Sequence, residues 1–267
     1  RNFGKKDDDG RPVAIKVTRA MQWLVAACAD AGLYDANTAV RGPGVWRGPI
    51  EEFASLIVHA GDALRVGGRW EATGQKLGGV LYAAAPKVAR PADKAAGPEV
   101  GRALLAVLRR WRYESEIGAD LVLGYIGAAG LGGAPSWRAH MIVNGPRGCG
   151  KTWLTEVVAA ALGAGAHPTT NNFTEAGLRQ VMTGEARAVV LDESEHDEST
   201  RVQAVIELIR HMSAGDGAKI MRGSASGTAM GFQVTGAAFM SSILHAPLKP
   251  QDRSRITIVR LLPLAAD

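Results

Sequence analysis

One eight-residue stretch limits the possible folds of this chain more than any other: GPRGCGKT, at positions 145–152. It fits the pattern G-x-x-x-x-G-K-[ST], in which glycines let successive backbone N–H groups turn toward phosphate oxygens. An apolar run typical of a buried strand precedes it at 140–144, and an Ala- and Leu-rich run without Gly or Pro follows it at 153–162. This order of strand, glycine loop and helix argues against a chance match in a glycine-rich chain. We therefore expect a phosphate-binding loop, which we call the phosphate loop, at 145–152.

The residues of the phosphate loop predict specific contacts with a bound nucleotide. Lys151 is expected to reach the β- and γ-phosphates, and the hydroxyl of Thr152 is expected to bind Mg²⁺. The helix that begins here adds the positive end of its dipole. The candidate nucleotide-binding residues are Gly145, Pro146, Arg147, Gly148, Cys149, Gly150, Lys151, Thr152 and Trp153.

A second stretch, AVVLDE at 188–193, is an apolar run that ends in two carboxylates about 40 residues after the phosphate loop. A buried strand of this kind delivers its last side chains to the carboxyl end of an open α/β sheet, where ligands bind. We expect Asp192 to hold the Mg²⁺ hydration shell and Glu193 to act as the general base that polarises water. Strands that end in acidic residues are common, so the prediction depends on the pairing with the phosphate loop.

Composition limits the class of protein. The chain has 267 residues, 46% of them hydrophobic, which is enough for a sizeable core, and its net charge of +5 suits a polyanionic partner. Its two cysteines, Cys28 and Cys149, are poor candidates for a structural disulfide, so we expect a reduced, cytoplasmic setting. No stretch predicts a membrane span. The chain begins with Arg1 rather than Met, so we expect it to be part of a longer protein.

The part before the phosphate loop predicts two regions. Residues 1–92 are expected to form an α+β subdomain, with a helix over 13–31 and several strands within 40–82, two of them joined at Gly67-Gly68. Residues 93–135 are expected to be a helical segment, with helices at 99–116 and 117–129, and 136–267 to be the core. Four arginines of the strand region either contact nucleic acid or lie on solvated strand faces; they are Arg41, Arg47, Arg65 and Arg69.

The part after the phosphate loop predicts a short strand at 166–170, a helix at 175–182 capped by Thr174, and a β-hairpin over 218–234 that carries Lys219 and Arg222. An apolar strand at 237–242 ends in two serines, either because a γ-phosphate sensor stands there or because serine suits the following turn. Arginines precede the last strand, 256–261, and either stabilise phosphate charge across a subunit interface or pair with Asp252. The residues concerned are Ser241, Ser242, Arg253 and Arg255.

Taken together, these motifs resemble the AAA+ ATPase core of superfamily 3 helicases, and more narrowly the helicase-like part of phage and mobile-element primase-helicases. The resemblance rests on GPRGCGKT (145–152), VVLDE (189–193), GAKIMRGSASG (217–227), AFMSSI (238–243) and DRSRITI (252–258). It implies an α/β fold with a parallel five-stranded sheet in the order 5-1-4-3-2. It also implies ATP and Mg²⁺ as cofactors and a hexameric ring that hydrolyses ATP between subunits.

The resemblance further implies a role for individual residues. Lys219 and Arg222 are expected to grip single-stranded DNA, Arg255 or else Arg253 to act as the arginine finger, and Ser242 or Ser241 to act as the sensor, where the family usually has Asn. No primase residues are recognised, so a primase domain or replication partner is expected outside this chain. Two other functions stay open: an AAA+ switch or loader that remodels a protein partner, and a small-molecule kinase. The histidines show no metal-ligand spacing.

Overall fold

The computed structural model of the protein describes residues 4–6, 8, 12–32, 38–49, 56–171, 173–192, 199–213, 215, 218–223, 229–242 and 248–264. By its internal contacts the chain divides into two units, residues 1–38 and residues 39–267. The domain boundaries expected at 92/93 and 135/136 stay predictions. Among the described residues, no helix combines the length and the apolar character that crossing a bilayer requires.

The first unit consists of an antiparallel pair, β1 (Gly4–Lys6) and β2 (Pro12–Ile15), followed by α1 (Val17–Ala31). The sequence predicted a helix from residue 13, which is wrong for its first turn because residues 12–15 pair with β1 instead. Gly32 ends the helix with φ +81°, a conformation that a side chain would disfavour.

The second unit begins with small sheets, and this part confirms the predicted strand region. An antiparallel sheet runs in the order β4 (Gly44–Arg47), β5 (Leu56–His59), β6 (Ala63–Val66) and β7 (Arg69–Ala72). A second sheet has the order β3 (Val40–Arg41), β9 (Val80–Tyr82) and β8 (Gln75–Leu77). We call residues 39–91 the β subdomain.

Residues of the β subdomain pack on one another and on the core. Gly67 and Gly68 both have positive φ, as a two-residue hairpin turn between β6 and β7 requires. Trp46, Ile57 and Leu64 form a buried cluster with Tyr82 and with Ala186 of the core. Backbone hydrogen bonds also join the two parts, for example from Ala186 N to Pro43 O (2.9 Å) and from Gly133 N to Val45 O (2.8 Å). The β subdomain is therefore fixed to the core by its backbone as well as by its side chains.

Two helices, α2 (Pro98–Leu108) and α3 (Gly118–Gly130), connect the β subdomain to the core sheet. The sequence predicted that the first helix runs to residue 116, but it ends at Leu108. Residues beyond it pair with the last strand of the core instead: Glu114 N donates to Arg260 O (2.9 Å) and Leu262 N to Arg112 O (2.8 Å). This pairing covers the carboxyl end of β15, the outer strand of the sheet.

The core is a parallel sheet in the order β11 (Val189–Asp192), β14 (Ala238–Ser242), β10 (His140–Asn144) and β15 (Ile256–Arg260). If β10 is counted as strand 1, this is the expected order 5-1-4-3, but the sheet has four strands rather than five. The expected strand 2 forms only isolated parallel bridges, Ala166↔Ala188 and Thr170↔Leu191. Along this segment His167 N donates to Ala188 O (2.8 Å) and Thr170 N donates to Val190 O (3.3 Å). Donors three residues apart thus face acceptors two residues apart, and the extra residue interrupts the ladder.

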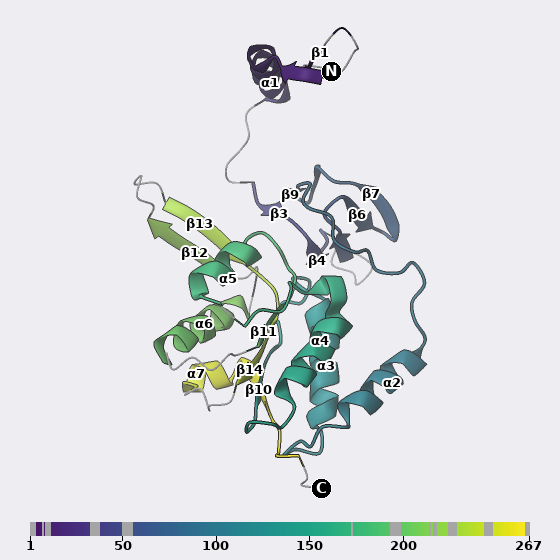
Figure 1. Cartoon of the computed structure of the whole chain (residues 1–267), viewed down its shortest axis with the longest axis vertical. Helices are drawn as coiled ribbons and strands as arrows, with labels where there is room; N and C mark the ends of the chain where they lie inside the picture. Colours follow the sequence, from purple (N-terminus) through teal and green to yellow (C-terminus); the bar gives the residue numbers. More distant parts are fainter. Residues whose placement is uncertain are drawn as a thin grey trace. The chain divides into compact units, whose positions relative to one another are not determined.

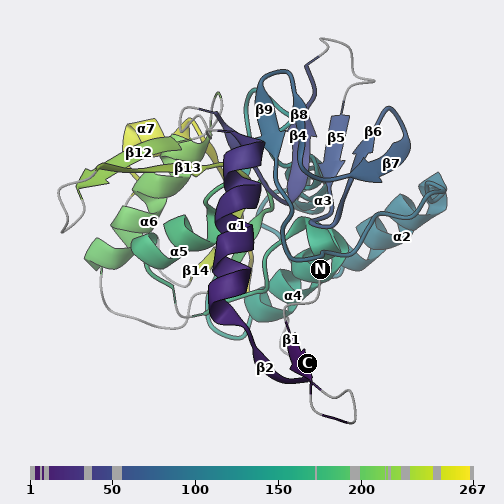
Figure 2. The ribbon, with the colours of Figure 1, turned by 90° about the horizontal axis from the view of Figure 1, so that it is seen from above.

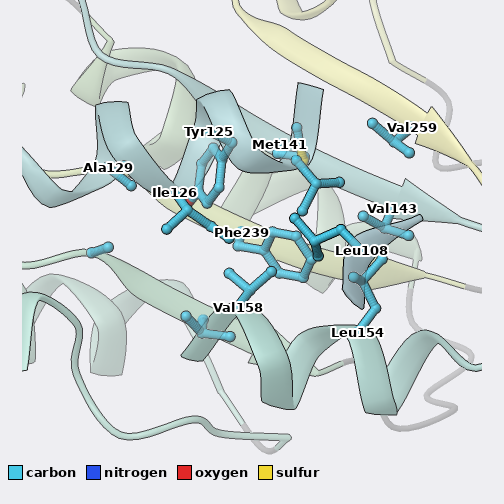
Figure 3. Close-up of a cluster of buried hydrophobic side chains, with 14 of the residues drawn as sticks. Leu108, Tyr125, Ile126, Ala129, Met141, Val143, Leu154, Val158, Phe239 and Val259 are labelled. Carbon is cyan, nitrogen blue, oxygen red and sulfur yellow. The ribbon is translucent and has the colours of Figure 1, made fainter. Parts of the chain in front are cut away.

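Helices cover both faces of this sheet (Figure 1). On one face, α3 and α4 (Lys151–Leu162) pack on Met141, Val143, Val190 and Phe239, the cluster drawn in Figure 3. On the other face, α5 (Glu175–Met182) and α6 (Ser199–Met212) pack on Ile142, Leu191 and Met240. The alternation of side chains along each strand therefore assigns every strand residue to one of two helical layers.

The remaining elements follow α6 or flank the sheet. The short 3₁₀ turn η2 (Gly163–Gly165) follows α4, and α7 (Pro250–Arg253) precedes β15. The hairpin β12 (Ala218–Gly223) and β13 (Ala229–Val234) confirms the predicted hairpin and extends from the α5 and α6 side, away from strands β4–β9 (Figure 2). Thr174 caps α5 as predicted, since its Oγ1 accepts from Gly177 N (3.0 Å).

Candidate nucleotide site

The phosphate loop leaves the carboxyl end of β10 and turns into α4, and its backbone depends on glycine at several positions. Gly148 and Gly150 have φ of +74° and +86°, values that residues with a side chain rarely adopt. A Cβ on Gly145 would lie 2.6 Å from Cys149 Sγ, so the chain closes on itself too tightly for any other residue. Gly150 is the N-cap of α4, and none of the described side chains caps this helix. The first N–H groups of α4 therefore remain available to an anion.

Lys151 lies over the loop that precedes it. Its Nζ donates to Gly145 O (2.7 Å) and to Pro146 O (2.8 Å), and it is 3.9 Å from Cys149 Sγ. Loop carbonyls are weak partners for an ammonium group compared with phosphate oxygens, which carry a full charge. The arrangement keeps the charge of Lys151 at the mouth of the loop.

The loop residues differ in exposure. Cys149 is buried, whereas Pro146, Arg147, Gly148, Thr152 and Trp153 are exposed. Trp153 is 71% exposed, which is high for the largest apolar side chain, and it directly follows the expected Mg²⁺ ligand Thr152. The accessible part of the loop thus contains a hydroxyl and an aromatic ring beside the backbone donors.

Trp111 is a contact of the phosphate loop that the sequence analysis missed. Its indole Nε1 donates to Gly150 O (2.9 Å), and a Cβ on Gly150 would lie 2.8 Å from that nitrogen. The helical pattern over 99–116 had assigned Trp111 only to the apolar face of a helix. Because α2 ends at Leu108, Trp111 instead reaches the start of α4 from the connection to α3. No local pattern signals a contact between residues 39 positions apart.

Asp192 ends β11 and meets the adjacent strand β14. Its Cα is paired with that of Ser241, and Ser241 Oγ donates to Asp192 Oδ1 at 2.5 Å. Ser241 is in turn paired with Val143 of β10, so these three side chains lie on the sheet face that packs against α4. The β11 and β10 backbones are separated by one strand, about 10 Å. Asp192 and the phosphate loop therefore lie at the same end and on the same face of the sheet.

Ser242 is assigned to the opposite face. Side chains two residues apart in a strand point to the same face, so Ser242 lies on the face of Met240, which belongs to the cluster under α5 and α6. Ser242 is 2% exposed. Of the two serines expected at the end of this strand, the structure brings Ser241 to Asp192. Glu193, the expected general base, lies outside the described residues.

The two expected finger arginines lie at the other end of the sheet. Arg255 immediately precedes Ile256, which is paired with His140 at the amino end of β10. Its Nη1 donates to Gln251 O (3.1 Å), and its guanidinium lies 5.7 Å from the ring centre of Trp137. A five-residue strand spans about 16 Å, so Arg255 is remote from the phosphate loop of its own chain.

Asp252, which the sequence offered as a salt-bridge partner for these arginines, pairs elsewhere. It is fully buried, its Oδ1 accepts from Arg210 Nη1 (3.3 Å), and its Oδ2 accepts from Lys249 N (3.1 Å). Arg253 is exposed at the end of α7. Both candidate fingers are therefore distinct from the ion pair that holds α7 on α6.

The expected DNA-contacting residues both lie in β12. Lys219 is paired with Gln233 and Arg222 with Met230, so both belong to the hairpin as predicted, while their side chains lie outside the described part of the chain. Within the described residues, no group of three or more His, Cys, Asp or Glu side chains could hold a metal ion. Asp192 and Thr152 carry oxygen atoms of the kind that Mg²⁺ binds.

Comparisons with known proteins give distant structural matches. No family model matches the chain, and no curated protein matches it. Among solved structures, a variant of RuvB from Thermotoga maritima is 17% identical with a TM-score of 0.35, and the match covers 58% of this chain and 47% of that one. The JCV helicase bound to a small organic compound is 14% identical with a TM-score of 0.38, and the match covers 66% of this chain and 48% of that one. The chain thus spans about half the length of the structures it matches.

Proposed function

We propose that this chain is an ATP hydrolase that binds its nucleotide between the phosphate loop and Asp192, and that it works as a DNA helicase or translocase in an oligomeric ring. One observation carries the proposal. A glycine-dependent loop with an exposed helix start and a carboxylate held by a neighbouring strand occur at the same end and on the same face of one parallel sheet. This is the arrangement in which open α/β sheets bind phosphorylated ligands.

The residues fit Mg²⁺-ATP. The N–H groups from Gly148 to Thr152 bind phosphate oxygens, and Lys151 exchanges its two carbonyl partners for the β- and γ-phosphates. Thr152 Oγ1 and Asp192 supply the hard oxygen ligands that Mg²⁺ prefers. An Mg²⁺ ion held by these two residues would neutralise charge that develops on the phosphates. Ser241 fixes Oδ1 of Asp192 and so orients the other carboxylate oxygen.

Hydrolysis also needs a base and a positive charge near the γ-phosphate. Glu193 follows Asp192 directly and takes the base role in this proposal. Arg255 or Arg253 supplies the charge to a neighbouring subunit, because the amino end of β15 is too far from the nucleotide of the same chain. A ring, which we propose to be a hexamer, follows from this division of the site between subunits.

The proposed coupling to DNA rests on the hairpin β12–β13. Lys219 and Arg222 stand on the same strand and supply two positive charges for the phosphates of single-stranded DNA. The hairpin follows α6, and α6 follows the Asp192-Glu193 segment along the chain. Nucleotide-dependent movement of that segment would therefore be transmitted to the hairpin. A primase domain or replication partner outside this chain belongs to the same proposal.

The direct test is ATP hydrolysis with and without single-stranded DNA, followed by strand displacement. We expect DNA-stimulated hydrolysis by the unaltered chain and its loss in Lys151→Ala, while Lys76→Ala, a surface lysine of β8, serves as the matched control. Lys219→Ala with Arg222→Ala should keep basal hydrolysis and lose stimulation by DNA. Hydrolysis that ignores DNA, without strand displacement, would contradict the helicase and favour a loader that acts on a protein.

A further inference from the structure

A cavity of about 300 Å³ lies where the β subdomain meets the core, at the amino end of the core sheet. Arg41 and Arg47 from the β subdomain line one side together with Tyr82, and the connection 133–136 and Gly215 line the other. We call this cavity the arginine pocket. It is remote from the phosphate loop, because residues 133–136 precede β10 and the loop follows it, about 16 Å along the strand.

Contacts within the protein hold the guanidinium groups of Arg41 and Arg47 in place. Arg41 Nη1 donates to Tyr82 Oη (3.1 Å) and to Arg47 O (3.3 Å), and its guanidinium lies 4.7 Å from the ring centre of the buried Trp46. Arg47 Nε donates to Ala134 O (3.1 Å). Each guanidinium group thus uses one nitrogen for hydrogen bonds within the protein. Its other nitrogens remain as donors for a ligand, because a guanidinium carries five N–H donors.

Among the described residues, no carboxylate compensates the positive charge of the pocket. Neither Arg41 nor Arg47 takes part in the ion pairs found among the described residues. None of the described residues that line the pocket is Asp or Glu. Two guanidinium groups that face one cavity repel each other, so an anion between them would relieve that repulsion.

Tyr82 gives an independent indication of a ligand oxygen. Its side chain is 1% exposed, and its hydroxyl oxygen accepts from Arg41, so its own hydrogen points elsewhere. Among the described residues no acceptor for this hydrogen is found. A buried hydroxyl normally donates as well as accepts. The charged and phenolic side chains of the pocket therefore offer donors: guanidinium N–H groups and one phenolic O–H.

The core side of the pocket is rigid. Arg138 is almost fully buried, and its guanidinium donates to Met212 O (2.7 Å), Pro135 O (3.1 Å) and Gly215 O (2.7 Å). These bonds tie the segment before β10 to the segment after α6. A rigid wall opposite two fixed arginines is a preformed site, which binds at a lower entropic cost than a flexible one.

We propose that the arginine pocket binds a phosphate group, at a site separate from the nucleotide site. Guanidinium groups match the geometry of phosphate oxygens, and the tyrosine hydroxyl adds a third donor. The phosphate comes either from a nucleic-acid strand or from a free phosphate compound. Trp137, which follows Ser136 of the pocket and is 51% exposed, offers a ring on which a base of a bound strand would stack.

The test uses the full chain in a Lys151→Ala background, so that phosphate held at the phosphate loop does not obscure the pocket. Arg47→Gln and Tyr82→Phe each remove one donor, and Arg69→Gln removes an exposed charge from β7 outside the pocket. Binding of inorganic phosphate is measured by calorimetry, and binding of fluorescent oligothymidylate by anisotropy. Thermal unfolding verifies that each variant is folded.

We expect Arg47→Gln to weaken binding about tenfold or more, Tyr82→Phe to weaken it by a smaller factor, and Arg69→Gln to leave it almost unchanged. Weaker binding of both probes, or of oligothymidylate alone, identifies a nucleic-acid phosphate; the slope of log K against log salt should then fall by about 0.7. Weaker binding of inorganic phosphate alone identifies a free phosphate compound. Unchanged binding of both probes, or an equal loss in Arg69→Gln, overturns the proposal. None of these outcomes depends on ATP hydrolysis.

Discussion

Ser241 donates a hydrogen bond of 2.5 Å from its Oγ to Oδ1 of Asp192, and this bond joins two adjacent strands at the edge of the proposed nucleotide site. A carboxylate held by one oxygen keeps the other oxygen in a fixed direction. The bond also makes Oδ1 a weaker metal ligand than Oδ2, because one of its lone pairs is engaged. Ser241 therefore acts on the proposed Mg²⁺ site through Asp192.

We expect Ser241→Ala to lower ATP hydrolysis about tenfold or more and to raise the Mg²⁺ concentration needed for half-maximal activity, because a hydrogen bond to a charged group is lost. Ser242→Ala is the matched control, because Ser242 lies on the other face of the sheet. The measurement is hydrolysis as a function of Mg²⁺ concentration. Equal effects of the two substitutions, or an unchanged Mg²⁺ dependence in Ser241→Ala, would show that the bond does not orient Asp192.

Trp111→Phe tests whether the indole N–H positions the phosphate loop. The ring remains to pack against the core, but the donor to Gly150 O is lost, so we expect a two- to tenfold weaker affinity for an ATP analogue, corresponding to about 0.5–1.5 kcal/mol. The melting temperature should change little in Trp111→Phe and fall clearly in Trp111→Ala, which also removes packing. Fluorescent-nucleotide titration measures the affinity. If the affinity falls only in variants whose melting temperature also falls, Trp111 is a packing residue and its N–H does not position the phosphate loop.

The trans role proposed for Arg255 predicts complementation between subunits. Arg255→Ala should lower hydrolysis about a thousandfold if it removes an arginine finger. Lys151→Ala removes the nucleotide site but keeps the finger. Mixed rings of the two variants should then recover hydrolysis that neither variant shows alone, whereas a cis role predicts no recovery.

Arg253→Ala serves as the matched control for this experiment, because Arg253 is exposed and stands two residues away. If Arg253→Ala, and not Arg255→Ala, complements Lys151→Ala, the finger is Arg253. Arg255→Lys separates charge from geometry, since an ammonium cannot replace the planar guanidinium that stacks near Trp137.

Stability should depend on pH through His140. Burial, helped by the nearby charge of Arg138, lowers its pKa from 6.5 to about 3, and its Nδ1 accepts from Ala238 N (3.1 Å). The unfolded chain takes up this proton near pH 6.5 and the folded chain does not. The stabilisation is therefore fully present above about pH 6.5 and is lost as the pH falls toward 3, by up to about 1.4 kcal/mol per pH unit.

Urea unfolding between pH 7 and pH 4 measures this dependence. His140→Asn keeps an acceptor for Ala238 N and removes the titrating group, so its free energy of unfolding should vary less steeply with pH than that of the unaltered chain. A slope that His140→Asn does not change would contradict the assignment.

The sequence predicted the parts of this fold that short-range patterns encode. The phosphate loop, the strand before it, the hairpin turn at Gly67-Gly68 and the cap at Thr174 each depend on residues close together in the chain. The order of the four core strands followed from the resemblance. The alternation of side chains along β14 also predicts which serine faces α4. Phe239 and Ser241 point to the same face, and Phe239 is part of the cluster under α4.

The rest depended on contacts that no local pattern carries. Helical periodicity predicted that α2 continues past Leu108. It carries no information on the backbone hydrogen bonds that residues 112–114 form with the end of β15 and the residues after it. The contact between Trp111 and Gly150 and the arginine pocket both arise where segments far apart in sequence meet. The interrupted second strand is another such case, because the extra residue between the donors His167 and Thr170 is recognised only against their acceptors in β11.

Pro168 of this strand limits what the core sheet can become. A β-strand from another molecule that approached the outer side of this segment would meet a position without a donor, held between two separate bridges. Exposed edges of parallel sheets otherwise invite such growth into aggregates. Because His167 N donates inward to Ala188 O, the nitrogen of the exposed Pro168 faces outward. This proline therefore removes a donor from the outer side of the segment and disfavours association with another strand there.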